Sequence, residues 1–112
     1  ENTGQIINTS SVLGTKVRAN AGAYSATKYA VEALSEAMRL ELADTNVKVT
    51  CIEPGLVMTD LHDHFEVHPK DVIGLEEPLQ PIDIARIVLH VATQPAHVFV
   101  PKVMVLPKHN AI

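Results

Sequence analysis

The sequence predicts an α/β fold in which strands and helices alternate in the order strand, helix, strand, helix, strand. Residues 5–10 and 47–53 have the length and the apolar, β-branched composition of buried strands. Between them, residues 22–43 carry apolar side chains at helical spacing. A chain of 112 residues with 46% apolar content is large enough for one compact core.

Composition excludes several classes of partner. The net charge is −4 and no basic run occurs, so we expect neither nucleic acid nor an anionic membrane surface as a partner. No apolar run approaches the ~20 residues that span a bilayer. The single cysteine, Cys51, cannot form an internal disulfide and is typical of a small buried residue. These features favour a cytoplasmic protein.

The first predicted strand, Gln5–Ser10, contains the pair Ile6-Ile7, which suits a parallel strand covered on both faces. Ser10, Ser11 and Gly14 follow in a polar loop at its carboxyl end. Serines in such loops commonly satisfy backbone groups, and we expect this role for Ser10.

The helix predicted over 22–43 has one apolar stripe and one charged face. The stripe consists of Ala26, Ala30, Ala33, Leu34, Ala37, Met38 and Leu42. Glu32, Glu36 and Arg39 are expected on the outer face, with Glu36 and Arg39 spaced for an exposed ion pair.

Tyr24 and Lys28 lie four residues apart at the start of this helix, so both side chains project from one face. A neighbouring ammonium stabilises a phenolate, which is how a tyrosine becomes a proton donor and acceptor. Such pairs are also common on exposed helix surfaces, so the pair alone does not identify a site.

The second predicted strand, 47–53, is stopped by Pro54-Gly55. A right-handed crossover makes it parallel to the first strand. The polar residues that follow both strands therefore gather at one edge of the sheet, where open α/β sheets bind ligands.

Together these motifs resemble the C-terminal half of a short-chain dehydrogenase/reductase. The matching features are the strand leading to Ser11, the Tyr-x-x-x-Lys pair, and Pro54-Gly55-x-Val57-x-Thr59, with a separation of 13 between Ser11 and Tyr24. The resemblance implies the C-terminal half of a Rossmann-like, doubly wound parallel sheet. Residues 1–112 would then form a single partial domain.

The resemblance also implies roles. Ser11 would hydrogen-bond the substrate oxygen, Tyr24 would transfer the proton, and Lys28 would support Tyr24 and bind the nicotinamide ribose. Ser11 and Tyr24 would thus contact substrate. Cofactor contacts would come from Tyr24, Lys28, Pro54, Gly55, Leu56, Val57 and Thr59. Thr59 also suits a helix N-cap, and the two roles are compatible.

The implied reaction moves hydride between NADP or NAD and a small alcohol or carbonyl compound, including hydroxy acids. The ending Gln-Pro-Ala-His-Val over 94–98 resembles the NADP-linked branch that acts on 3-hydroxy acids and serine. No G-x-x-x-G-x-G turn occurs, so we expect a fragment that is inactive when isolated. The resemblance further implies a homodimer or homotetramer built on the long helix.

The remaining segments are less regular. The resemblance places a mobile substrate-covering segment over 61–80, and His62, His64 and His68 there raise the alternative of a metal site with Asp63. No further ligand cluster supports this alternative, and we predict no metal. Pro81–Thr93 is predicted as a helix and Val98–Leu106 as a strand interrupted at Pro101.

Two other functions are alternatives. The chain could be an inactive remnant or an oligomerisation module of such an enzyme. A serine hydrolase is disfavoured because no G-x-S-x-G motif occurs.

Overall fold

The computed structural model describes residues 3–57 and 77–109. Within them, strands pair in parallel in the order β1-β2-β3. The elements are β1 (Thr3–Thr9), the short 3-10 turn η1 (Val12–Gly14), α1 (Gly22–Glu41), β2 (Asn46–Pro54), α3 (Pro81–Ala92) and β3 (Lys102–Val105). This order confirms the predicted alternation of strands and helices.

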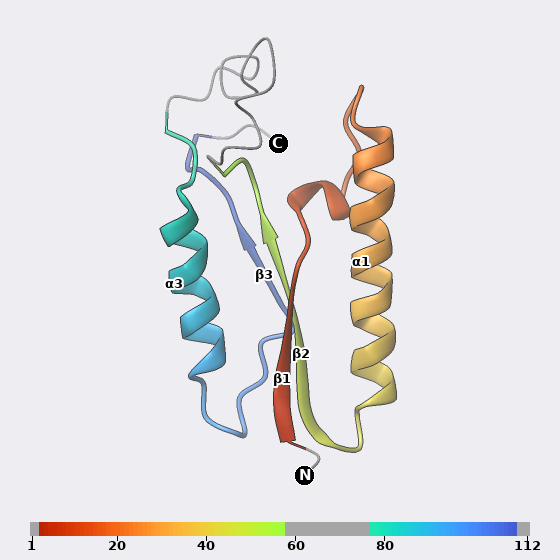
Figure 1. Ribbon diagram of the computed structural model, residues 1–112, viewed down its shortest axis with the longest axis vertical. Coiled ribbons are helices and arrows are strands. Elements are labelled where there is room, and N and C mark those ends of the chain that lie inside the picture. Colours follow the sequence, from red (N-terminus) through yellow and green to blue (C-terminus); the bar gives the residue numbers. More distant parts are fainter. Residues whose placement is uncertain (1–2, 58–76, 110–112) are drawn as a thin grey trace.

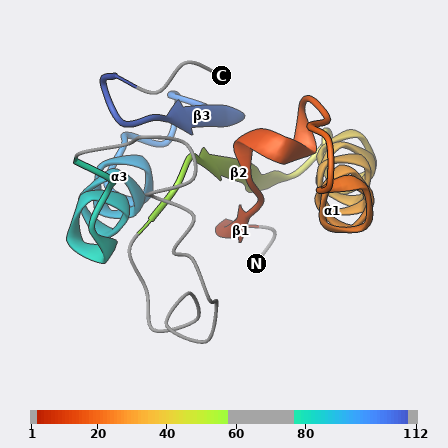
Figure 2. The ribbon, with the colours of Figure 1, turned by 90° about the horizontal axis from the view of Figure 1, so that it is seen from above.

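The two helices lie on opposite faces of the sheet, as the view from above shows (Figure 2). This is the doubly wound arrangement that the sequence predicts. The amino end of α1 and the carboxyl ends of β1 and β2 lie at the same end of the molecule (Figure 1). Neither helix in the described ranges is long and apolar enough to cross a membrane.

β2 is the central strand, and it forms most of the core. Its register places Ile6 of β1 opposite Val49 and Lys102 of β3 opposite Cys51. From Val49 to Pro54 every residue of β2 is buried, and Ile52 has no exposed surface. The apolar, β-branched composition of this segment therefore matches burial on both faces.

β1 differs from the prediction. The sequence suggests a strand covered on both faces, yet β1 is mostly exposed or half-buried, and Ile6 keeps 36% of its surface accessible. The reason is that α1 packs mainly against η1 and β2 rather than over β1.

The orientation of α1 is also opposite to the prediction. Its buried residues are Ser25, Glu32 and Ser35, whereas the predicted stripe is largely exposed, with Leu34 at 64%. The expectation that Glu32 lies on the outer face is therefore wrong. A hydrogen bond from Asn8 to the Ser35 hydroxyl, 2.9 Å long, illustrates the polar contact between α1 and the sheet. The predicted Glu36–Arg39 ion pair is confirmed.

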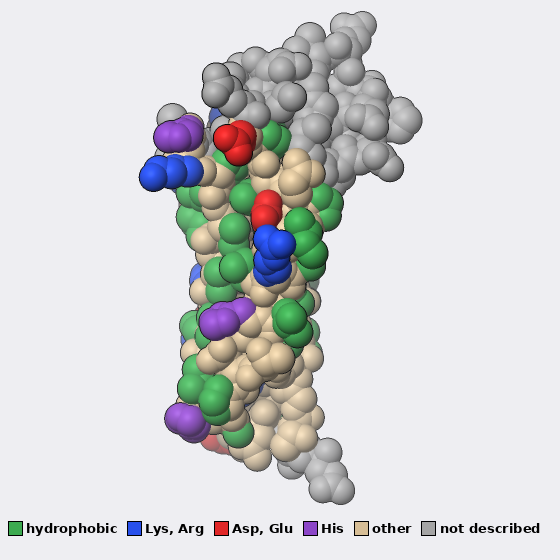
Figure 3. All heavy atoms as spheres, turned by 90° about the vertical axis from the view of Figure 1, so that its left-hand side faces the viewer, with side chains coloured by type: hydrophobic (Ala, Val, Ile, Leu, Met, Phe, Trp, Pro, Cys, Tyr) green, Lys and Arg blue, Asp and Glu red, His purple; other side chains and the backbone are tan. Residues whose placement is uncertain are grey.

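The C-terminal elements agree with the predicted positions but are shorter. At the start of α3 the Gln80 N–H donates to the Asp83 carboxylate at 2.8 Å. β3 begins only at Lys102, after Pro101, which has no N–H to donate but accepts a bond from the Cys51 N–H at 2.9 Å. Apolar side chains are scattered over the face of the molecule on which α3 lies (Figure 3). In α3 itself, Ile82 and Leu89 are exposed.

Candidate active site

Three segments that carry predicted site residues lie at the carboxyl edge of the sheet (Figure 1). The first is the turn after β1 with Ser11, the second is the start of α1 with Tyr24 and Lys28, and the third is the Pro54–Val57 segment after β2. Open α/β sheets bind ligands at this edge. Thr59, His62, His64 and His68, with most of the predicted 61–80 segment, lie outside the described residues.

Ser11 is a buried N-cap. Its backbone is extended, and the residue as a whole is 6% exposed. Its Oγ accepts a hydrogen bond from the Leu13 N–H at 3.1 Å. This bond uses an acceptor lone pair of the hydroxyl, and the O–H can still donate. The local structural role of Ser11 is therefore compatible with the predicted one.

Ser10 joins the same turn to α1. The residue is buried, and its hydroxyl donates to the Lys28 carbonyl oxygen at 3.5 Å, a long contact. This agrees with the expectation that Ser10 satisfies backbone groups. It also ties the turn that holds Ser11 to the helical turn that holds Lys28.

Gly14 allows this close approach. A Cβ at Gly14 would lie 2.6 Å from the Ser10 Oγ, 3.0 Å from the Lys28 carbonyl oxygen and 3.1 Å from the Glu32 Cγ. Any side chain would push η1 away from α1. The glycine therefore sets the spacing between the serine turn and the helix.

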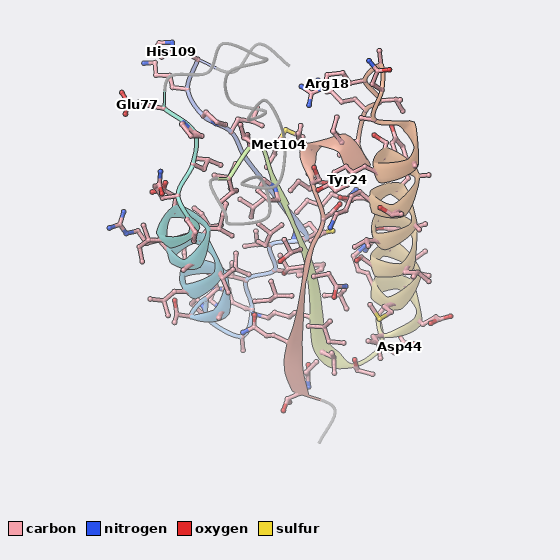
Figure 4. The ribbon with its side chains drawn as sticks, turned by 45° about the horizontal axis from the view of Figure 1, so that its top comes forward. Arg18, Tyr24, Asp44, Glu77, Met104 and His109 are labelled. Carbon is pink, nitrogen blue, oxygen red and sulfur yellow. The ribbon has the colours of Figure 1, made fainter. Side chains whose placement is uncertain are left out.

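Tyr24 and Lys28 share one face of α1, as predicted. The Lys28 Nζ lies 5.7 Å from the centroid of the Tyr24 ring and donates to the Thr9 carbonyl oxygen at 3.5 Å. Tyr24 is 49% exposed, and Figure 4 shows it at the start of α1 beside η1. The ammonium thus connects the end of β1 with a phenol that remains accessible to a ligand.

The segment Pro54–Val57 is held by backbone bonds on both sides. The Gly55 N–H donates to Val105 at 2.7 Å, and the Leu56 carbonyl accepts from Leu79 at 3.0 Å. Val57 forms an isolated parallel bridge with Leu79. These bonds fix the backbone that the sequence predicts as the cofactor contact.

Two buried glutamates beneath these segments are not among the predicted site residues. Glu32 is 9% exposed and Glu53 is 3% exposed. The sequence carries a signal for Glu32, since it lies four residues after Lys28 and therefore on the same face of α1. For Glu53 the signal is its place at the end of an otherwise apolar strand.

Burial dominates the electrostatics of this pair. Burial raises the pKa of Glu53 to about 7, and a hydrogen bond with Glu32 and repulsion from its charge act in the same direction. Burial also acts to raise the pKa of Glu32, but hydrogen bonds with Glu53, Ser10 and Cys51 and the charge of Lys102 outweigh it and lower that pKa. The charge therefore resides mainly on Glu32.

Comparisons with known proteins agree with this architecture. Residues 1–69 match the family model of short chain dehydrogenases. An uncharacterized oxidoreductase of Staphylococcus aureus is 40% identical over 107 residues, which cover 96% of this chain and 44% of that protein. The chain thus spans less than half the length of such relatives.

Two solved structures are similar in both sequence and fold. Serine dehydrogenase from Escherichia coli is 36% identical with a TM-score of 0.75, covering 95% of this chain and 41% of that chain. A closed form of serine dehydrogenase complexed with NADP+ is 33% identical with a TM-score of 0.84, and the match covers 95% of this chain and 45% of that chain. With the family match over more than half of its residues, the chain belongs to the short-chain dehydrogenase family.

Proposed function

We propose that the full-length protein containing this chain is an NAD(P)-dependent oxidoreductase that transfers hydride between a nicotinamide cofactor and a small alcohol or carbonyl compound. The observation that carries this proposal is the arrangement of the Tyr24–Lys28 pair beside the serine turn at the carboxyl edge of the sheet. Membership of an oxidoreductase family supports it.

The donor groups at this edge fit a nicotinamide nucleotide. Lys28 has three N–H donors, and the Thr9 carbonyl at 3.5 Å accepts from only one of them, so the ammonium can also bind the ribose hydroxyls. The backbone of Pro54–Val57 would face the nicotinamide ring. When bound, the cofactor gives or takes the hydride. The NADP+ complex of a similar structure supports NADP as the first candidate, with NAD as the alternative.

The chain's own residues would manage the proton and the developing charge. The Tyr24 hydroxyl would donate its proton to the carbonyl oxygen in reduction and take the alcohol proton in oxidation. The Lys28 ammonium would stabilise the phenolate left behind.

Ser11 would hold the reacting oxygen. The Leu13 N–H occupies one side of its Oγ at 3.1 Å, which directs the hydroxyl proton away from the turn. A donor held in this way stabilises the charge on the substrate oxygen by about 3 kcal/mol.

Hydroxy acids and their carbonyl counterparts are the first substrates to test. Two of the similar structures are serine dehydrogenases, and serine is a small acid that carries a hydroxyl group.

Cofactor binding tests the proposal. Reduced NADP or NAD is added to the full-length protein, and nicotinamide fluorescence and thermal unfolding are followed. A cofactor at 100 times its Kd should stabilise the fold by about 2.7 kcal/mol. Hydride transfer is then measured by nicotinamide absorbance with a panel of small alcohols and hydroxy acids. The proposal fails if neither cofactor binds.

We also infer that the protein assembles with copies of itself through the outer face of α1. Tyr29, Leu34 and Leu40 are 42%, 64% and 60% exposed along this helix. Small alanines between them allow another helix to approach closely. An exposed apolar face of this kind supports a protein contact.

A further inference from the structure

The carboxyl groups of Glu32 and Glu53 meet in the interior, between α1 and β2. The Cys51 Sγ of β2 donates to Glu32 Oε2 at 3.4 Å, and Glu53, two residues further along β2, projects from the same face of that strand. A hydrogen bond between the two carboxyl groups agrees with this placement. Glu32 Oε1 and Glu53 Oε2 are both buried, and neither accepts a hydrogen bond from any residue in ranges 3–57 and 77–109. A buried acceptor without a hydrogen bond is costly, and two adjacent carboxylates also repel each other.

A single proton removes both difficulties. It turns one carboxyl into a donor for the other, so that the two groups share a hydrogen bond and only one negative charge remains. We propose that Glu32 and Glu53 share one proton and that this carboxyl pair holds the serine turn, α1 and β2 in their relative positions.

The groups around the pair match one negative charge. From β3, the Lys102 Nζ lies 3.5 Å from Glu32 Oε1. From β2, the Cys51 Sγ donates to Glu32 Oε2 at 3.4 Å. The segment between β1 and η1 contributes the Ser10 hydroxyl. One ammonium balances one carboxylate, and a second carboxylate would be uncompensated.

The opposite pKa directions of the two glutamates agree with this distribution. The pKa of Glu53 is raised to about 7 by burial, whereas that of Glu32 is lowered. Glu53 therefore keeps the proton, and Glu32 carries the charge that faces Lys102.

The position of the pair connects it to the candidate site. Glu32 follows Lys28 by four residues on α1, and its Cγ would lie 3.1 Å from a Cβ at Gly14. Glu53 directly precedes Pro54. Glu32 is thus a positioning residue for all three site segments. This positioning role rests on the proposed function, whereas the proton shared by Glu32 and Glu53 is independent of that function.

The shared proton is tested first, on the full-length protein without cofactor. The free energy of unfolding is measured against pH for the wild type, Glu53→Gln and the control Glu36→Gln, which alters a more exposed glutamate of the same helix. Between about pH 5 and pH 7 the unfolding equilibrium constant of the wild type and the control should rise about tenfold per pH unit relative to Glu53→Gln. Parallel profiles for all three proteins would overturn the shared proton.

A second measurement covers the case in which Glu53→Gln does not fold. The side-chain carboxyl carbons of the wild type are followed by NMR with 13C-labelled glutamate. One buried carboxyl should titrate near pH 7 and its neighbour below the ordinary glutamate range. Ordinary titration of every glutamate would contradict the proposal.

Positioning is tested by turnover, again with the full-length protein. Glu32→Ala should lower kcat at least about tenfold. Glu32→Gln, whose amide can donate to Glu53 at every pH, should keep most of the wild-type kcat.

The pH dependence of turnover gives a further test of positioning. Above about pH 7 the wild type should also lose kcat relative to Glu53→Gln. Unchanged kcat in Glu32→Ala would refute the positioning role. A protein with no turnover at all would refute the proposed function, while the unfolding profiles would still decide the shared proton.

Discussion

The Lys28 ammonium lies 5.7 Å from the centroid of the Tyr24 ring and also contacts the Thr9 carbonyl oxygen at 3.5 Å. One side chain therefore links the last residue of β1 to the phenol on α1. Because the phenol and the ammonium have different proposed tasks, substitutions at the two positions should have separable effects.

Replacing Tyr24 removes the proposed proton donor and leaves the ring in place. Tyr24→Phe in the full-length protein should lower kcat by about 10²–10⁴-fold, the usual contribution of a general acid or base. Cofactor affinity measured by nicotinamide fluorescence should change little. Tyr29→Phe, on the same helix and 42% exposed, is the control and should keep normal turnover. Normal turnover in Tyr24→Phe would exclude the proposed role.

Replacing Lys28 removes both the charge beside the phenol and a proposed ribose contact. Lys28→Ala should weaken cofactor binding about tenfold or more, since hydrogen bonds to charged groups contribute about 1.5–3 kcal/mol. The kcat of alcohol oxidation should also fall, because the positive charge proposed to stabilise the phenolate is removed. Lys16→Ala, in the exposed loop before α1, serves as the control. An unchanged Kd and an unchanged kcat would contradict both proposed tasks of Lys28.

Gly14→Ala tests the close contact between η1 and α1. The added methyl group would lie 3.0 Å from the Lys28 carbonyl oxygen, so we expect a loss of about 1–3 kcal/mol in the free energy of unfolding. Gly22→Ala is the matched control, because nothing lies within 4 Å of a Cβ there and alanine favours helix. Denaturant titration should therefore separate the two variants, and equal stability would show that the turn adjusts freely.

Cys51 should be poorly reactive in the folded protein. Burial raises the pKa of its thiol, and the Glu32 and Glu53 carboxyl groups act in the same direction, against a hydrogen bond with Ser35. At about pH 8 a thiol reagent should modify Cys51 at least about tenfold more slowly in the native protein than in urea, and the native rate should keep rising to higher pH. The reaction is assigned by comparison with Cys51→Ser. Equal modification rates in the native protein and in urea would mean that the Cys51 thiol is accessible in the folded state.

Leu34→Lys tests assembly through α1. Leu34 is 64% exposed, so the substitution should leave the free energy of unfolding within about 0.5 kcal/mol while it places a charge in the proposed contact. Light scattering should then show smaller particles than for the wild type. Leu89→Lys, equally exposed on α3, should keep the wild-type mass. A mass unchanged by Leu34→Lys would place any assembly elsewhere.

The sequence was sufficient for the order of elements and for the edge where the site segments meet. Strand composition, helical spacing and the stop at Pro54 are local signals, and they predict β1, α1, β2 and α3 to within a few residues. The separation of 13 between Ser11 and Tyr24 is part of the family resemblance, and the structure places the two residues in η1's N-cap and in α1.

The interior face of α1 could not be predicted from periodicity alone. Apolar periodicity assigns Ala26 and Leu34 to the core, but the helix turns Ser25, Glu32 and Ser35 toward the sheet. The cause is tertiary, because partners such as Asn8 and Cys51, distant in sequence, satisfy these polar groups. The exposed apolar stripe shows that an amphipathic pattern does not by itself say which face meets the sheet.

The register between β2 and β3 has a consequence for how this chain tolerates changes in length. Cys51 lies opposite Lys102, and this pairing places the lysine on the side of the sheet that carries Glu32. A one-residue shift of β3 against β2 would turn Lys102 to the opposite face and withdraw the balancing cation, because side chains alternate along a strand. The irregular stretch from Pro95 to Val100 can absorb added residues without such a reversal. Natural or engineered insertions should therefore accumulate before Pro101 and be excluded from the four residues that follow it.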